Sequence, residues 1–254
     1  MRQQLPSNPR IEWAWPETVA RETFVADYFD YSSGEHVTFL GPTGCGKTTL
    51  ASELVHTNAN NRRPALVLVI KPEDRTVSQL FLTGRARYQL VRSWPPLPWQ
   101  HKPGYVLWPK HTFDPEKDDP VLKREMRKGI LAGYGNKIKG GKGDPTGNIL
   151  FCDEVWGLVD LGLRRELVTV WTRARAMGCG LWAATQRPAL IPLSAYSEPE
   201  HMFIHYSPDK GARDRYKEIG GVSPDMVAAV TERMQWYEFL YINRVDRSYC
   251  IVAA

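Results

Sequence analysis

The sequence predicts an α/β fold in which a mainly parallel sheet is covered by helices on both faces. Short apolar runs recur along the chain, and each is bounded by glycine, proline or polar residues, as expected of strands buried on both sides. Stretches with helical periodicity separate these runs, and this alternation is typical of parallel sheets. The expected strands are residues 36–40, 65–70, 149–152, 181–185 and 202–206.

The helical stretches are recognised by apolar residues that recur at spacings of three and four. The expected helices are residues 17–30, 48–57 and 161–177, followed after Asp209 by two further helices and then a C-terminal hairpin of residues 237–242 and 249–252.

The domain organisation is expected to be simple. Residues 1–33 form an N-terminal arm and helix, and residues 34–254 form a single domain. Trp13 and Trp15 indicate that the arm docks through its indoles, either on its own core or on a neighbouring subunit. Residues 88–147 are an insertion in the domain. Its first part is rich in proline, carries two expected short strands near residues 88–92 and 105–108, and has no assigned task.

Composition narrows the class of protein. The chain has 254 residues, of which 43% are hydrophobic and 24% charged, so disordered, collagen-like and disulfide-scaffold classes are excluded. The four cysteines show no short spacing typical of a zinc site. The longest apolar run, residues 65–70, is far shorter than the ~18 residues that a membrane span needs. With no signal-like N-terminus, we expect a cytoplasmic protein without a membrane partner.

The formal net charge of +5 can be assigned to one segment of the chain. Residues 121–147 contain seven cations and two anions, so their balance equals that of the whole chain. The remaining chain is neutral on balance.

Residues 41–48, Gly-Pro-Thr-Gly-Cys-Gly-Lys-Thr, match the phosphate-binding loop G-x-x-x-x-G-K-[ST] between an expected strand and an expected helix. The glycines let backbone N–H groups turn toward an anion, and the helix N-terminus adds its positive end. Lys47 would reach the β- and γ-phosphates of ATP, and the Thr48 hydroxyl would bind Mg²⁺. Cys45 is expected to be a spacer. The predicted nucleotide-binding residues are Gly41, Pro42, Thr43, Gly44, Cys45, Gly46, Lys47, Thr48 and Thr49.

Two adjacent carboxylates end the expected strand 149–152. Asp153 can hold Mg²⁺ through water, and Glu154 can orient or deprotonate the attacking water. This pair favours hydrolysis over simple nucleotide binding.

Strand 181–185 would deliver Thr185 and Gln186 to the same edge of the sheet. Gln186 can hydrogen-bond the γ-phosphate or the water and so report hydrolysis. The alternative is a polar strand end with only a structural role.

Together these motifs resemble those of the FtsK/HerA superfamily of ring-forming, DNA-pumping ATPases. The most specific similarity is Ala-Arg-Ala-Met-Gly at residues 174–178, which leads into a strand ending in Ala-Thr-Gln-Arg-Pro at residues 184–188. The similarity extends from the first strand to Pro188. It implies a RecA-like core of the additional-strand type, with Glu154 as the catalytic acidic residue and Gln186 as the sensor.

The resemblance also implies that an arginine near the end of the helix before the sensor strand reaches the γ-phosphate of a neighbouring subunit. Arg175 occupies the matching position, and Arg173 is the second candidate. The alternative is an arginine that pairs with the last carbonyl groups of its own helix.

The chain looks most like the compact viral genome-packaging ATPases of this superfamily. Other members of the superfamily carry membrane helices, a winged-helix domain or an N-terminal barrel, and none of these is expected here. A nuclease domain is not expected either, because the sequence shows no second acidic cluster.

The second half of the basic segment 121–147 is expected to be flexible because it contains Gly129, Gly133, Gly135, Gly140, Gly141, Gly143 and Gly147. Lys137, Lys139 and Lys142 alternate with these glycines shortly before strand 149–152. A mobile lysine loop in the channel of a ring would grip DNA phosphates without reading bases. An exposed, solvated loop is the alternative.

The resulting hypothesis is an Mg²⁺-dependent ATPase that forms a homo-oligomeric ring, pentameric or hexameric, and translocates double-stranded DNA into a viral capsid. A capsid portal or vertex protein would be a further partner, and the host cytoplasm the place of action. Two alternatives stay open. One is a DNA-transfer ATPase of a plasmid or conjugative element, and the other is a nucleotide-binding regulator or small-molecule kinase.

Overall fold

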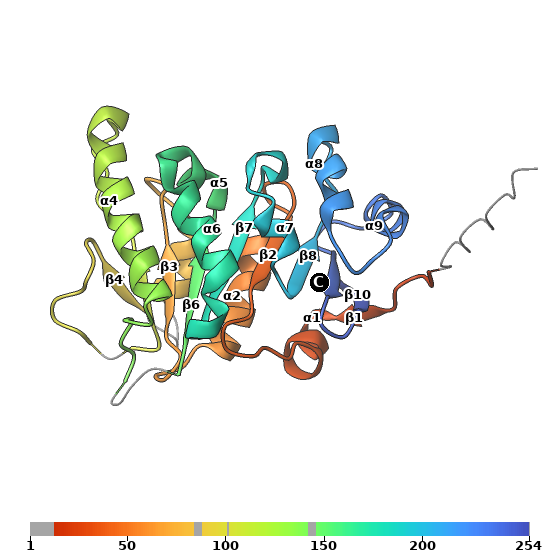
Figure 1. Ribbon diagram of the computed structural model, residues 1–254, viewed down its shortest axis with the longest axis horizontal. Helices are drawn as coiled ribbons and strands as arrows, with labels where there is room; N and C mark the ends of the chain where they lie inside the picture. Colours follow the sequence, from red (N-terminus) through yellow and green to blue (C-terminus); the bar gives the residue numbers. More distant parts are fainter. Residues whose placement is uncertain (1–12, 84–87, 101, 142–145, 254) are drawn as a thin grey trace, which may run out of the picture.

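A single sheet organises the chain in the computed structural model, which describes residues 13–83, 88–100, 102–141 and 146–253 (Figure 1). Its strand order is β1-β10-β9-β8-β2-β7-β6-β3-β5-β4, and all pairings are parallel except β9 with β8 and with β10. The strands are β1 Thr18–Ala20, β2 Val37–Leu40, β3 Ala65–Leu68, β4 Gln89–Val91, β5 Gly104–Leu107, β6 Asn148–Cys152, β7 Cys179–Thr185, β8 His201–Ile204, β9 Phe239–Asn243 and β10 Ser248–Ala253.

The central strands are buried on both faces because helices cover each side. Every residue of β2, β3, β6 and β7 is buried. Alternate residues of β3 enter two separate cores, Leu66 and Leu68 on one side and Val67 on the other. The expected α/β class with a mainly parallel sheet is therefore confirmed.

Different helices cover the two faces (Figure 1). One core contains residues of α4 Pro115–Tyr134, α5 Val155–Leu158 and α6 Arg164–Arg173. The other contains residues of α2 Lys47–Asn58, α3 Arg75–Val77 and the π-helices η1 Phe24–Tyr28 and η2 Ser78–Leu82. The remaining short helices are α1 Arg21–Thr23, η3 Val159–Leu163, η4 Arg175–Met177, η5 Pro188–Leu190, α7 Ser194–Ser197, α8 Lys210–Arg215, η6 Tyr216–Glu218 and α9 Pro224–Thr231.

The helix expected over residues 17–30 is wrong at its start. Residues 18–20 form β1, which pairs in parallel with β10, and the N–H of Ile251 donates to the carbonyl of Glu17 at 2.7 Å. The strand satisfies backbone groups of β10 that would otherwise lie at an open sheet edge. Helical structure begins only at α1.

The described part of the N-terminal arm packs on its own chain. The Tyr249 hydroxyl donates to the carbonyl of Ala14 at 3.1 Å, and the Arg233 guanidinium lies 5.2 Å from the centre of the Trp15 ring. Trp13 packs against the core that contains α4 and α6. Residues 13–15 thus contact their own chain, as one of the two expected docking modes requires.

The helix expected over residues 161–177 is divided. Gly162 has a φ of 78°, a left-handed conformation that interrupts the helix before α6. A 3-10 turn, η4, follows α6 and ends at Gly178. The hairpin β9–β10 and the extra strands β4 and β5 lie where the sequence predicts them.

Much of the basic segment is helix rather than loop. Asp114 caps α4 by accepting from the N–H of Glu116, and α4 continues to Tyr134. A Cβ atom at Gly133 would lie 2.5 Å from Leu150, so this glycine brings the helix close to the sheet. The interpretation of Gly129 and Gly133 as flexible loop residues is therefore wrong. No helix within the described residues is both long and apolar enough to cross a membrane.

Candidate active site

The phosphate loop joins β2 to α2 at the edge of the sheet where the parallel strands end. Gly44 and Gly46 have φ values of 81° and 94°, which residues with side chains rarely adopt. Gly46 precedes Lys47, the first residue of α2, so the loop's N–H groups and the helix N-terminus share one cavity. The local sequence thus builds an anion site from backbone atoms.

Lys47 lies folded over its own loop. Its ammonium group donates to the carbonyls of Gly41 at 2.8 Å and Pro42 at 2.7 Å. Burial lowers the pKa of Lys47 because it disfavours the charged form. Burial likewise raises the pKa of the Cys45 thiol and keeps it protonated, which fits a spacer better than a nucleophile.

Asp153 and Thr48 meet directly. The Thr48 hydroxyl donates to Oδ1 of Asp153 at 2.5 Å, although 105 positions separate the two in sequence. Hard oxygen ligands of this kind suit Mg²⁺ that arrives with nucleotide phosphates. Within the described residues no group of three His, Cys, Asp or Glu side chains could hold a metal alone. The donors therefore fit a metal whose remaining ligands are phosphate and water.

Glu154 is tied to the strand expected to act as sensor. The Thr185 hydroxyl donates to Oε1 of Glu154 at 2.7 Å, and the N–H of Gln186 donates to Oε2 at 3.2 Å. Burial raises the pKa of Glu154, while these hydrogen bonds act in the opposite direction. The Gln186 side chain accepts a hydrogen bond from the Thr43 hydroxyl of the phosphate loop. One set of contacts thus joins three sequence motifs.

β7 explains why these motifs meet. It lies between β2, which precedes the phosphate loop, and β6, which ends in Asp153 and Glu154. Parallel strands end at the same edge, so residues following all three gather there. This is the additional-strand arrangement that the resemblance implies.

Lys71 belongs to the site but was not among the predicted residues. Its ammonium group lies 2.9 Å from Oδ2 of Asp153 and 3.0 Å from Oδ2 of Asp74. Partial burial alone lowers the pKa of Lys71, but the two carboxylates outweigh it and hold the pKa above its usual range. Lys71 follows the expected strand 65–70, so the strand-end argument used for Asp153 could have found it.

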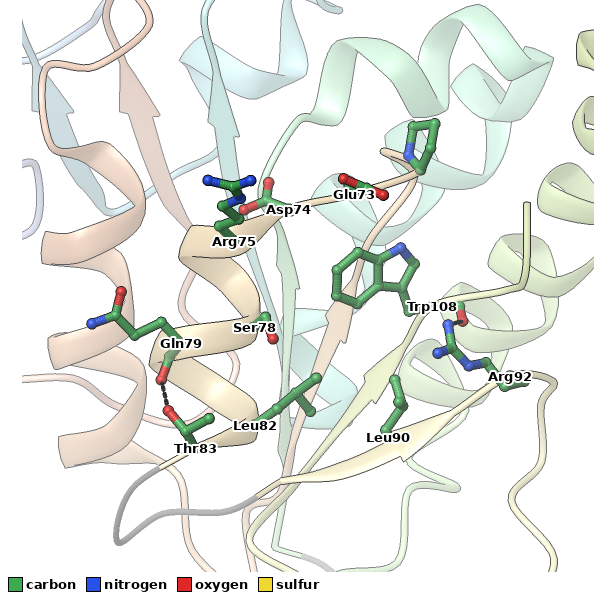
Figure 2. Close-up of a pocket in the computed structure, with 11 residues that line it drawn as sticks. Glu73, Asp74, Arg75, Ser78, Gln79, Leu82, Thr83, Leu90, Arg92 and Trp108 are labelled. Atoms are coloured by element: carbon green, nitrogen blue, oxygen red, sulfur yellow. Dashed lines mark hydrogen bonds between the residues drawn. The ribbon is translucent and has the colours of Figure 1, made fainter. Parts of the chain in front are cut away.

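A second cavity, of about 560 Å³, adjoins the phosphate site and shares Asp74 with it. Figure 2 shows Leu82 of η2 and Leu90 of β4 on its floor, with the indole of Trp108 beside them. The Trp108 indole N–H donates to the carbonyl of Lys71 at 2.8 Å. The wall of this cavity therefore fixes the backbone from which Lys71 reaches Asp153.

Arg175 and Arg173 lie away from the phosphate loop of their own chain. Both precede β7, so they lie at the edge where the parallel strands begin. Arg175 pairs with Oε1 of the buried Glu200 at 2.6 Å, and the N–H of His36 donates to the other oxygen of Glu200 at 2.7 Å. Arg173 is exposed. The structure gives Arg175 a carboxylate partner instead of the helix carbonyls considered from the sequence.

Lys137 and Lys139 also lie at this edge, between α4 and β6. Both are exposed, and neither forms an ion pair with any residue that the structure describes. Between them Ile138 is buried, and the Tyr105 hydroxyl donates to the carbonyl of Lys139. This part of the lysine segment is therefore anchored. Lys142 lies outside the described residues.

The sequence matches no family model and no curated protein. Solved structures share its fold. The genome packaging NTPase B204 from Sulfolobus turreted icosahedral virus 2, in complex with sulfate, has a TM-score of 0.59 and 14% identity, covering 87% of this chain and 97% of that one. The same protein with AMPPCP gives a TM-score of 0.57 at 14% identity, covering 87% of this chain and 98% of that one.

The Type VII secretion ATPase EccC also shares the fold. EccC from Thermomonospora curvata (ATPases 2 and 3), in complex with a signal sequence peptide, gives a TM-score of 0.54 at 14% identity, covering 89% of this chain but 38% of that one. The chain therefore has the RecA-like fold of P-loop ATPases, as the sequence motifs implied.

Proposed function

We propose that the chain is an Mg²⁺-dependent ATPase that forms a homo-oligomeric ring and drives double-stranded DNA into a viral capsid. The observation that carries this proposal is the convergence of Thr48 with Asp153, and of Glu154 with Thr185 and Gln186, beside the phosphate loop. The shared fold supports it, because B204, a genome packaging NTPase, has the same architecture over most of both chains.

The proposed roles follow from the contacts. Lys47 would exchange two backbone carbonyls for the phosphates of ATP. Thr48 and Asp153 would hold Mg²⁺, which supplies positive charge to neutralise the phosphates. Glu154 is held by donors on two sides and would orient the attacking water and accept its proton. Gln186 would hydrogen-bond the γ-phosphate, so loss of this phosphate on hydrolysis would change the contacts at the end of β7.

Ring formation gives Arg175 a role that it cannot have within one subunit. It lies at the opposite edge of the sheet from its own phosphate loop, so contact with a γ-phosphate requires a second copy of the chain. An arginine supplied by a neighbour can accelerate phosphoryl transfer about 10³- to 10⁵-fold. We propose that Arg175, or Arg173 as the second choice, acts in this way in a pentamer or hexamer.

DNA contact is proposed for the lysine segment. Lys137 and Lys139 are exposed cations on an anchored turn, and Lys142 follows them in sequence. Exposed lysines bind the backbone phosphates of DNA whatever its base sequence, and a packaging motor in the host cytoplasm requires such binding. A portal or vertex protein of the capsid is the proposed docking partner.

ATP hydrolysis with and without linear double-stranded DNA tests the function. We expect DNA to stimulate turnover at low salt and the stimulation to fall as salt rises, because each phosphate contact releases counterions. Glu154→Gln should lower turnover about 10²- to 10⁴-fold while AMPPCP still binds. Glu232→Gln, at an exposed glutamate, is the matched control. If no DNA stimulates hydrolysis at low salt, the proposed DNA motor function is wrong. The alternative of a nucleotide-binding regulator or small-molecule kinase would then be favoured.

A further inference from the structure

Two exposed aromatic side chains lie beside the phosphate loop, and neither belongs to its motif. Trp236 and Tyr237 are 52% and 46% exposed in the segment between α9 and β9. A Cβ atom at Gly46 would lie 3.2 Å from the Tyr237 ring, and one at Gly44 would lie 3.9 Å from the Trp236 ring. The two rings thus lie next to the loop glycines, and the buried Phe239 ring lies 3.9 Å from the same Cβ position at Gly46.

The segment holds Tyr237 in an unusual conformation. Its φ of 73° lies in the left-handed region, which is uncommon for a bulky residue. Arg21 donates to the carbonyl of Tyr237 at 3.3 Å, and the N–H of Gln235 donates to the Glu238 carboxylate at 2.7 Å. Backbone strain of this kind persists where surrounding contacts enforce it, and it is frequent at ligand sites.

Trp236 supports the neighbouring ring. It meets His205 edge to face with ring centres 5.2 Å apart, and its centre lies 6.3 Å from that of Tyr237. His205 follows β8, the strand next to β2, so Trp236 is anchored to the sheet on one side of the phosphate loop. Trp236 thus contacts both His205 and Tyr237.

Tyr237 lines the same cavity, of about 330 Å³, as Lys47, Thr48 and Thr49. One end of this cavity offers backbone N–H groups, an ammonium and a hydroxyl, which suit phosphates. The tyrosine instead offers a flat, partly apolar face. Of the parts of a nucleoside triphosphate, only the base presents a matching face.

We infer that Tyr237, supported by Trp236, stacks against the base of the bound nucleotide and that the site takes purine nucleoside triphosphates. The inference rests on the proposed ATPase function and adds the part of the site that binds the base. Stacking on an aromatic ring is tolerant of base identity and grows with ring area. We therefore expect ATP and GTP to bind with similar affinity and CTP and UTP more weakly.

Calorimetric titration with AMPPCP and with inorganic tripolyphosphate tests the inference. Stacking on one ring corresponds to an affinity change of about 5- to 150-fold. Tyr237→Ala should weaken AMPPCP binding by a factor in that range and leave tripolyphosphate binding within about twofold. Tyr237→Phe should retain AMPPCP affinity, since the ring is kept. Both variants keep a Cβ atom, so the backbone strain is matched.

The outcomes separate this inference from the proposed function. If Tyr237→Ala binds AMPPCP like the wild type, or loses AMPPCP and tripolyphosphate affinity in parallel, the stacking role is wrong, while wild-type hydrolysis still supports the ATPase. If the wild type binds neither compound, the proposed ATPase and the base site both fail.

Discussion

The ammonium group of Lys71 lies 2.9 Å from Oδ2 of Asp153, whose other oxygen accepts the Thr48 hydroxyl. Lys71 also contacts Asp74, which caps α3 by accepting from the N–H of Val77 at 2.9 Å. The carboxylate expected to serve the metal is thus balanced by a cation. This contact couples the metal site to the cavity wall formed by Trp108.

Removal of Lys71 should destabilise the protein without nucleotide. Lys71→Met leaves the largely buried Asp153 without its cation, and an unsatisfied buried group costs about 1–3 kcal/mol. Urea unfolding measures the free energy of unfolding, and part of the loss should return with Mg²⁺ and AMPPCP. Lys117→Met is the control, because its pair with Asp114 is exposed and should be worth about 0–1 kcal/mol. If both variants lose the same free energy of unfolding, the contact between Lys71 and Asp153 stabilises the protein no more than an exposed ion pair does.

The raised pKa of Glu154 should appear in the pH dependence of kcat/KM. A general base must be ionised, so the acidic limb should have its midpoint above 4.5, the ordinary value of this group. Thr185→Val removes a hydrogen bond that favours the ionised form and should move the midpoint higher. Thr172→Val, at an exposed threonine of α6, should not move it. A midpoint at or below 4.5 in the wild type would contradict a raised pKa of Glu154.

The same shift has a consequence for stability. The folded state binds the Glu154 proton more tightly than the unfolded state does, so stability from this group is present below pH 4.5 and is lost as pH rises through the folded pKa. Glu154→Gln should therefore raise the midpoint of thermal unfolding at pH 7 and raise it less near pH 4. A loss of stability at pH 7 would show that the contacts with Thr185 outweigh the cost of burial.

Arg175 should act across a subunit boundary. Arg175→Ala should lower ATP turnover by a factor approaching 10³. Mixing it with Glu154→Gln subunits should restore part of the activity, because each variant supplies what the other lacks. Because Arg175 also pairs with Glu200, unfolding curves must show that the variant is folded. If a folded Arg175→Ala variant keeps full turnover, Arg173 becomes the candidate for the arginine that acts on the neighbouring subunit. The variant Arg173→Ala is then tested in the same mixture with Glu154→Gln.

The lysine segment should set the salt dependence of DNA binding. Replacing Lys137 and Lys139 by alanine should reduce the slope of log K against log salt by about one for each DNA phosphate that the variant no longer neutralises. Basal ATP turnover should not change, because both residues lie at the opposite edge of the sheet from the phosphate loop. Lys117→Ala serves as the surface control. An unchanged slope would assign DNA contact to another surface.

The phosphate loop and its partners could be predicted because short-range rules govern them. A glycine-rich turn after an apolar strand builds its own anion site, and carboxylates that follow buried strands gather at one edge. The same rule applies to Lys71. It was missed because a single lysine after a strand carries no motif.

Other features depended on tertiary contacts that local pattern does not encode. Residues 18–20 form a strand only because β10 presents an open edge. The glycines of α4 lie in a helix because the sheet demands close approach, as the distance between Gly133 and Leu150 shows. Tyr237 comes 190 positions after Lys47 and reaches the phosphate loop only through the order of β9, β8 and β2.

Displacement of a third strand from a DNA triplex tests the central claim, ATP-driven movement along double-stranded DNA, most directly. The account predicts that the wild-type protein releases the triplex-forming strand in the presence of ATP and Mg²⁺. Neither AMPPCP nor Glu154→Gln should support release. Rapid ATP hydrolysis on the same DNA with no strand release above the rate of spontaneous dissociation would contradict the account.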